Sequence, residues 1–155
     1  MTASGEAQAA AVAQALRQRW LAVLACADAP ALEQHAAQQA LPACTWLRRP
    51  EIGMVMLRGR AGGSGAQFNL GEATVTRCAV KSAAGQVGSG HVLGRDARHA
   101  ELVARFDAAL QDPAWQSRLL QQVIEPLAAA QRAQRDEASR RAAATRVEFF
   151  TLVRE

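Results

Sequence analysis

The sequence of 155 residues has little cysteine, a single lysine and no long hydrophobic run. Its three cysteines, Cys26, Cys44 and Cys78, are widely spaced and form no CxxC pair, which argues against a disulfide framework and against a structural zinc site. No apolar stretch approaches the roughly 20 residues that span a bilayer, and the first residues lack the pattern of a signal peptide. We therefore expect a cytoplasmic protein with reduced thiols, no bound metal and no membrane partner.

Arginine carries almost all of the positive charge. The formal net charge is +4, and Lys81 is the only lysine. Arginine binds carboxylates and phosphates through paired, planar hydrogen bonds, whereas lysine offers only a point charge. Acidic residues are interspersed among the arginines, so no basic run typical of a nucleic-acid-binding tail occurs. The composition favours anionic groups as partners and predicts no nucleic-acid partner.

Residues 7–40 are expected to be helical. Apolar residues recur at helical spacing in the first part, with Trp20 in the middle of the stripe. Asp28 and Pro30 then predict the start of a second helix, which ends before Pro42.

Residues 44–95 predict an antiparallel sheet of about four strands. The expected strands cover 46–49, 52–58, 68–80 and 86–95, with a kink at Pro50 because proline cannot donate to a strand ladder. Short connections between successive strands favour an antiparallel meander. Both faces of 52–58 are apolar, which indicates burial on both sides, against helices or against a partner protein.

Residues 96–144 are again expected to be helical. Asp96 and the pair Asp112–Pro113 are start signals, and Pro126 predicts a kink. The order of helices, strands and helices indicates an α+β fold, in one domain over 1–155.

An apolar tail closes the chain at 146–155. Phe149, Phe150 and Leu152 form an almost continuous apolar run there. Such a run needs to be packed, because an exposed apolar terminus frays or aggregates. It is either the last strand of the chain's own sheet or a partner interface, and the isolated chain is expected to self-associate.

Catalytic residues are not assigned by any complete constellation. Glu51 and Glu72 are the most suggestive carboxylates, because each lies in an arginine-rich strand region. His91 is a candidate acid–base group that could cluster with Cys78 and His99. The alternatives are charge pairing for the glutamates and structural roles for the histidines.

The glycine-rich connection at 59–65 is a candidate phosphate cradle, because successive backbone N–H groups can form an anion-binding nest. It lacks the Gly-Lys-Ser/Thr of a P-loop, and the alternative is a mobile hairpin loop. A second candidate is the junction at Arg95, where a strand leads into a helix N-terminus. The anion-binding or interface candidates are Arg58, Arg60, Gly62, Gly63, Arg77 and Arg95.

Several motifs in order along the chain resemble the PhnG family of the bacterial carbon–phosphorus lyase system. They are RPEIG at 49–53, FNLGEATVTRC at 68–78, GRD at 94–96 and ATRVEFFT at 144–151. The resemblance runs from about Arg17 to the end of the chain. It implies phosphonate catabolism in a hetero-oligomeric core complex with PhnI-, PhnH- and PhnJ-like subunits, and with PhnL for activity.

The resemblance also implies a reaction. The complex transfers an alkylphosphonate to the ribose C1 of a nucleoside triphosphate, which is the ribose 1-methylphosphonate 5-triphosphate synthase step. PhnI-type chains carry the nucleosidase chemistry, so this chain is expected to be an accessory subunit of a transferase, without catalysis or a cofactor of its own. The alternatives are a free-standing phosphate- or nucleotide-binding enzyme and a purely structural scaffold.

Overall fold

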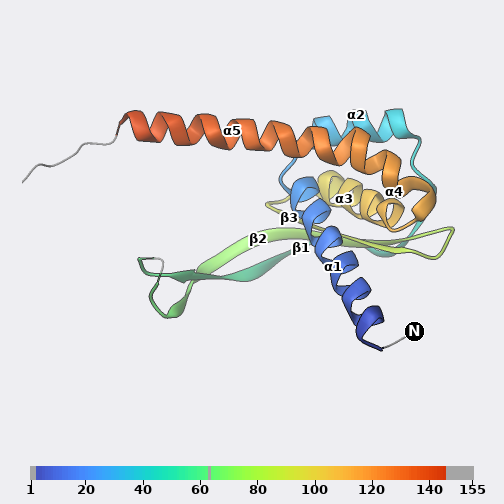
Figure 1. Ribbon diagram of the computed structural model, residues 1–155, viewed down its shortest axis with the longest axis horizontal. Helices are drawn as coiled ribbons and strands as arrows, with labels where there is room; N and C mark the ends of the chain where they lie inside the picture. Colours follow the sequence, from blue (N-terminus) through green and yellow to red (C-terminus); the bar gives the residue numbers. More distant parts are fainter. Residues whose placement is uncertain (1–2, 63, 146–155) are drawn as a thin grey trace, which may run out of the picture.

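The computed structural model describes residues 3–62 and 64–145 (Figure 1). Two helices, three strands and a second helical region follow one another along the chain, which confirms the α+β class. The elements are α1 (Ala3–Ala25), α2 (Ala29–Gln39), β1 (Cys44–Arg60), β2 (Gln67–Ser82), β3 (Val87–Leu93), α3 (Ala97–Leu110), α4 (Pro113–Leu119), the π-helical segment η1 (Leu120–Ile124) and α5 (Glu125–Ala144). The predicted tail at 146–155 lies outside the described residues.

The sheet has three antiparallel strands in the order β1-β2-β3, not about four. The two strands predicted on either side of Pro50 are parts of the single strand β1. Its pairing with β2 changes register between Trp46 and Arg48 and again between Arg48 and Glu51, so an irregularity accommodates the proline without ending the strand. β1 is an edge strand, where a missing N–H donor is tolerated.

Helix α3 covers one face of the sheet at very short range. A Cβ atom at Gly88 would collide with the carbonyl oxygen of Ala104, and one at Gly90 would collide with that of Ala100. Glycine at these two positions of β3 therefore lets the helix backbone lie directly on the strand backbone. The close approach fixes α3 as the layer on which the other helices pack.

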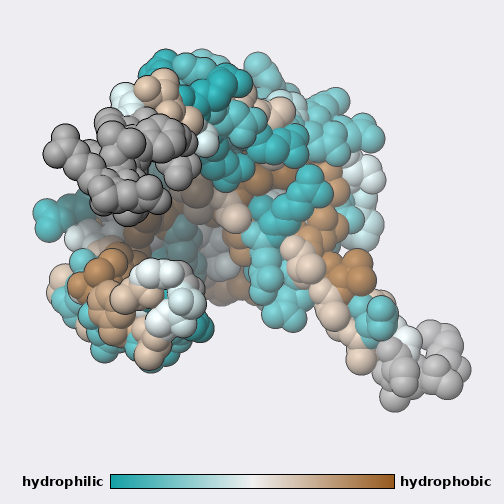
Figure 2. All heavy atoms as spheres, turned by 60° about the vertical axis from the view of Figure 1, so that its left-hand side comes forward, coloured by the Kyte–Doolittle hydropathy of each residue, from teal (hydrophilic) through white to brown (hydrophobic). Residues whose placement is uncertain are grey.

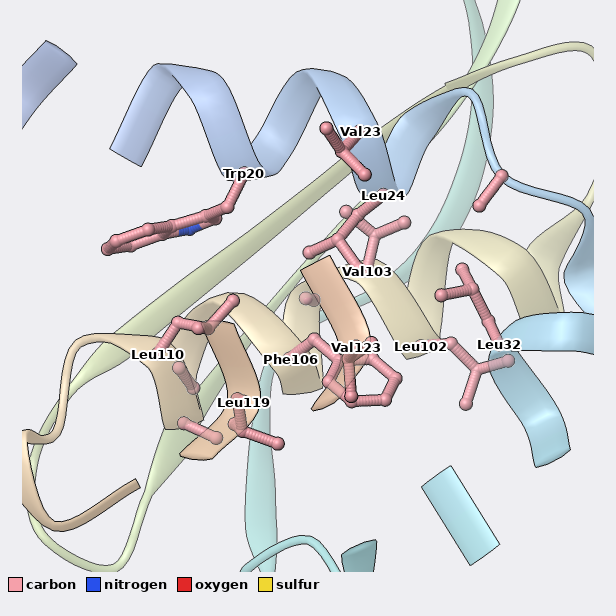
Figure 3. Packing of buried hydrophobic residues seen from close by; sticks show 14 of the residues in the cluster. Trp20, Val23, Leu24, Leu32, Leu102, Val103, Phe106, Leu110, Leu119 and Val123 are labelled. Atoms are coloured by element: carbon pink, nitrogen blue, oxygen red, sulfur yellow. The ribbon is translucent and has the colours of Figure 1, made fainter. Parts of the chain in front are cut away.

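The hydrophobic core lies between α3, the sheet and the surrounding helices (Figure 3). Trp20 and Leu24 of α1 point toward α3, where Phe106 and Leu110 are fully buried. The helical stripe predicted around Trp20 is thus confirmed in its second half. Val12, one turn nearer the N-terminus than Leu16, is exposed.

The helix start signals are largely confirmed. Asp96 accepts a hydrogen bond from the backbone N–H of His99, and Asp112 accepts one from Ala114. Asp28 precedes α2 but makes no side-chain capping bond. Pro126 lies in the first turn of α5, directly after the π-helical segment η1, so the irregular backbone precedes the proline. Among the described residues, no helix is long and apolar enough to cross a membrane.

β1 and β2 extend well past β3. The pairing of β3 with β2 stops at Val75, so the two longer strands continue as a two-stranded ribbon. We call this ribbon, together with the two β1 residues at its base, the hairpin arm and define it as residues 52–60 of β1 and 67–74 of β2. In Figure 1 it projects from the helical body at the same end as the C-terminal half of α5.

Candidate functional site

Three of the candidate residues form a row across the sheet. Glu51 of β1 lies opposite Arg77 of β2, and Arg77 lies opposite His91 of β3. The Glu51 carboxylate accepts a hydrogen bond from Arg77 Nε at 2.8 Å and lies 3.4 Å from Arg48 Nη1. All of these side chains are exposed on the face of the sheet opposite α3. Glu51 is therefore engaged by two guanidinium groups.

Glu72 is not part of this row. It lies opposite Met56 in the hairpin arm. Successive residues of a strand point to opposite faces, so Glu72 and Arg77, five positions apart on β2, face opposite sides. Arg77 therefore pairs with Glu51, and not with Glu72, the glutamate nearer to it in the sequence.

The glycine-rich connection forms the distal end of the arm. Gly62 adopts a left-handed backbone conformation with φ of 60°, and the N–H of Gly65 donates to the carbonyl of Ala61. Arg60 donates to the carbonyl of Gly65 at 3.2 Å, so its guanidinium closes the loop. Arg58 lies opposite Asn69 on the arm, and Gly63 lies outside the described residues. Arg95 is exposed and follows the end of β3, where Leu93 pairs with Val75 at the base of the arm.

Cys78, His91 and His99 do not come together. His99 is buried, with Nε2 2.9 Å from the carbonyl oxygen of Leu24, whereas His91 is exposed. The Cys78 thiol donates to the carbonyl of Ala100 at 3.0 Å, and burial raises its pKa to about 11. A protonated thiol is a poor nucleophile and a poor metal ligand. Within 3–62 and 64–145, no group of three or more His, Cys, Asp or Glu side chains could hold a metal ion.

A buried carboxylate, Asp107, is a residue that the sequence patterns did not mark. Asp107 is fully buried and accepts hydrogen bonds from Arg17, Trp20 Nε1 and the backbone N–H of Ser89. The bond to Asp107 raises the pKa of Arg17. The available signal was an acidic residue on the apolar stripe of a helix, one position after Phe106. Its partners lie on α1 and β3, so Asp107 joins three elements.

The hydrophobic residues of the arm are exposed. Ile52 lies opposite Thr76, and Met54 lies opposite Thr74. Directly opposite residues share a face, and on β2 this is the face on which Thr76, Cys78 and Val80 are buried. Yet Met54 is 68% exposed, and Met56, two positions along on the same face, is 51% exposed.

The inner face of the sheet therefore continues past the helices without a cover. In Figure 2 the arm comes forward at the lower left and shows hydrophobic side chains on its surface. The expectation that 52–58 is buried against helices of the same chain is not met among the described residues. Burial against a partner stays a prediction.

Two grooves lie along α1, away from the outward face of the sheet. The larger, of about 870 Å³, is lined by α1 from Gly5 to Trp20 together with Gln111 and Gln116. A smaller groove, of about 290 Å³, lies between α1 and α5 and is lined by Arg19, Arg132 and Arg135 among others. Neither groove is lined by Glu51, Glu72 or His91, so the candidate acid–base residues lie on open surface.

Comparison with known proteins decides the family. The family model of the phosphonate metabolism protein PhnG matches residues 15–155. The chain belongs to the PhnG family. A relative from Rhizobium meliloti (strain 1021), the alpha-D-ribose 1-methylphosphonate 5-triphosphate synthase subunit PhnG, is 48% identical over 111 residues, which cover 70% of this chain and 69% of the relative.

Membership of the PhnG family confirms the resemblance drawn from the motifs and places the chain in phosphonate metabolism. The matched range includes the whole sheet, the hairpin arm and the residues that line the smaller groove. The exposed arm and this groove therefore both lie within the part of the chain that the family model matches.

Proposed function

We propose that this chain is a non-autonomous subunit of ribose 1-methylphosphonate 5-triphosphate synthase and that the hairpin arm docks onto another subunit of that enzyme. The observation that carries the proposal is the uncovered inner face of the arm. The similar protein from Rhizobium meliloti is named as a subunit of this synthase, which supports the same role here.

The physical case begins with the apolar surface. Ile52, Met54 and Met56 are exposed on the inner face of this ribbon of two strands, and Phe68 and Leu70 are exposed beside Gly59 nearer its tip. A two-stranded ribbon is marginally stable in water, and its free edges invite pairing with another chain. Burying a large apolar side chain contributes on the order of 1.5–3 kcal/mol. A partner that covered this surface would therefore stabilise the arm and gain affinity at the same contact.

The arrangement of the candidate residues favours an accessory role over independent catalysis. Glu51 is held by Arg48 and Arg77, and His91 stands on the open outward face of the sheet. Catalysis of transfer to a ribose carbon needs a site that orients both reactants and excludes water. We propose that a PhnI-like subunit supplies that site, within a core complex that also holds PhnH- and PhnJ-like subunits.

Co-purification with a PhnI-like partner tests the docking surface. The double variant Met54→Lys, Met56→Lys is expected to lose the partner, because two charges in a buried apolar contact are costly. Leu93→Lys is the matched control: Leu93 lies on the same sheet, is 73% exposed and is outside the arm. Circular dichroism checks that the variants fold.

Two results would overturn the proposal. One is full assembly and full synthase activity with the Met54→Lys, Met56→Lys variant. The other is steady turnover of a nucleoside triphosphate by the isolated chain that Glu72→Gln abolishes. A purely structural scaffold is distinguished by Arg58→Ala, Arg60→Ala, which would leave the activity of the assembled complex unchanged.

A further inference from the structure

The groove between α1 and α5 is lined by three arginines, Arg19, Arg132 and Arg135, which are far apart in the sequence. Each helix contributes one face, with residues spaced three and four apart. The lining residues are Arg19, Ala22 and Val23 of α1, Cys26 directly after α1, and Ala128, Gln131, Arg132 and Arg135 of α5. Three guanidinium groups therefore border one space of about 290 Å³, and no acidic residue lines it.

Most other arginines of the described chain are matched by carboxylates. Ion pairs involve Arg17, Arg48, Arg77, Arg98, Arg105, Arg140 and Arg141. Within the described ranges, no ion pair joins Arg19, Arg132 or Arg135 to a carboxylate. Asp136 follows Arg135 in the chain, and Glu125 lines a neighbouring cleft together with Arg19, but neither lines this groove. The three side chains are exposed, so water screens their mutual repulsion, and an anion bound between them would gain the attraction of all three.

The carbonyl groups at the end of α1 are engaged within the fold and so oppose an anion in the groove less than the end of a helix ordinarily would. The groove lies beside the last turn of α1, where carbonyl groups give the helix end a partial negative charge. Here the carbonyl of Val23 accepts a hydrogen bond from Gln131 Nε2 at 2.8 Å, and the carbonyl of Ala22 accepts one from the N–H of Cys26. The carbonyl of Leu24 contacts His99 Nε2. These carbonyls are directed at donors within the fold.

We propose that this groove binds a phosphate oligoanion of the triphosphate type. A guanidinium presents paired donors that match phosphate oxygens. Three such groups, placed on two helices around one groove, offer more paired donors than a single phosphate can use and therefore favour a chain of linked phosphates. The inference rests on the proposed function for one source of the ligand, namely the triphosphate end of a nucleotide or ribose compound. Free polyphosphate has the same chemistry and is the other source.

Cys26 provides a local probe of the groove. It is exposed and lines the groove, whereas Cys44 is half-buried on another part of the fold and Cys78 is buried. Modification of Cys26 by N-ethylmaleimide, followed by peptide mass spectrometry, reports occupancy without competition from a charged reagent. Cys44 in the same digest is the internal reference. Inorganic tripolyphosphate is expected to slow the modification of Cys26 and to leave that of Cys44 unchanged.

A comparison of several ligands distinguishes the two sources, a nucleotide and free polyphosphate. ATP and tripolyphosphate are both expected to protect Cys26, while adenosine and orthophosphate at the same concentration are not. Stronger protection by ATP than by tripolyphosphate would assign the groove to a nucleotide; equal protection would assign it to the phosphate chain alone. Either result supports the shared chemistry.

Variants test whether the arginines carry the binding. Arg132→Ala, Arg135→Ala is expected to raise the half-protection concentration of tripolyphosphate at least about tenfold. Arg140→Ala, Arg141→Ala is the matched control, because it removes the same charge from the same helix at residues paired with Glu137 outside the groove. Arg132→Lys, Arg135→Lys keeps the charge and is expected to restore only part of the affinity, because lysine lacks the paired donors.

Several outcomes would overturn the inference. They are absence of protection by tripolyphosphate, an equal loss in the control variant, and equal protection by sulfate at matched ionic strength, which would indicate an adventitious ion only. Protection by an acidic peptide but not by tripolyphosphate would assign the groove to a protein partner instead. The docking proposal is tested by co-purification of arm variants and the groove by labelling of the isolated full-length chain, so either can fail alone.

Discussion

The inner face of the sheet has two different environments along its length. At the base, Cys78 and Val80 lie beneath α3 and are each 2% exposed. In the hairpin arm, Ile52 and Met54 lie on the same face, opposite Thr76 and Thr74, and remain exposed because no helix of the described chain covers them. The difference comes from the covering helix and not from the strands. An apolar strand face therefore predicts that something covers it, but the same chain need not supply the cover.

Polar groups show the same contrast. In the body, the buried carboxylate of Asp107 is matched by donors from α1 and β3. On the sheet surface nearer the arm, Glu51 is matched by exposed arginines, whose ion pairs contribute little to stability because water screens them. The buried polar group of the body is satisfied within the chain, whereas the surface of the arm is open to another molecule.

The largest difference in stability between the body and the arm is expected when a core side chain is truncated. Phe106→Ala is expected to lower the free energy of unfolding by about 3–5 kcal/mol, because it leaves a cavity in the packed core. Met54→Ala in the arm is expected to change it by less than about 0.5 kcal/mol, because the side chain is already solvated. Urea denaturation of the isolated chain measures both. Similar losses in the two variants would contradict the distinction between body and arm.

Removal of the buried carboxylate is expected to have the next largest effect. Asp107→Ala should cost about 2–3 kcal/mol, because it leaves Trp20 Nε1 and the N–H of Ser89 without their acceptor. Glu51→Ala on the exposed sheet face serves as the control and is expected to cost less than about 1 kcal/mol. Thermal or urea unfolding followed by circular dichroism gives both values; equal losses would show that Asp107 is not the tie between α1, α3 and β3.

The pKa values of two thiols should distinguish the base of the inner sheet face from the hairpin arm. Burial raises the pKa of Cys78 from its ordinary value of 9.0 to about 11. The folded state therefore holds the proton more tightly than the unfolded state, so this contribution to stability is complete below pH 9 and is lost as the pH rises toward 11. A cysteine introduced by Met54→Cys is solvated and should titrate near the ordinary value.

Alkylation at pH 8 measures the difference. We expect Cys78 to react at least about tenfold more slowly than the thiol of Met54→Cys, since the thiolate is the reactive form. Cys78→Ala should in addition flatten the fall in stability between pH 9 and 11. Equal alkylation rates at the two positions would mean that α3 does not shield the base of the sheet.

Local signals predicted most of the elements. The aspartates at 96 and 112 stand directly before helices, and apolar spacing around Trp20 marked the buried side of α1. These features depend on neighbours within a few residues, so the sequence displays them. The sequence predicted two strands around Pro50, whereas the structure has one. The effect of a proline depends on whether its strand is at an edge, which is a property of the whole sheet.

The site was harder to predict because it is made of distant pairs. The row from Glu51 to His91 depends on strand register, and the separation of Glu72 from Arg77 depends on the alternation of a strand whose length was known only roughly. The groove joins Arg19 to Arg132 and Arg135 across more than a hundred residues of sequence. Nothing near Arg19 in the chain distinguishes it from the other arginines of the helices.

Because the arm is uncovered, its conformational order should depend on the concentration of the partner subunit. Ligands that bind only the ordered state stabilise it in proportion to the logarithm of their free concentration. The arm should therefore gain protection from amide hydrogen exchange as its partner is titrated, while the amides of α3, packed on Gly88 and Gly90, stay slow throughout. The abundance of the other subunit, more than the sequence of the arm, would then set how rigid this part of the molecule is in the cell.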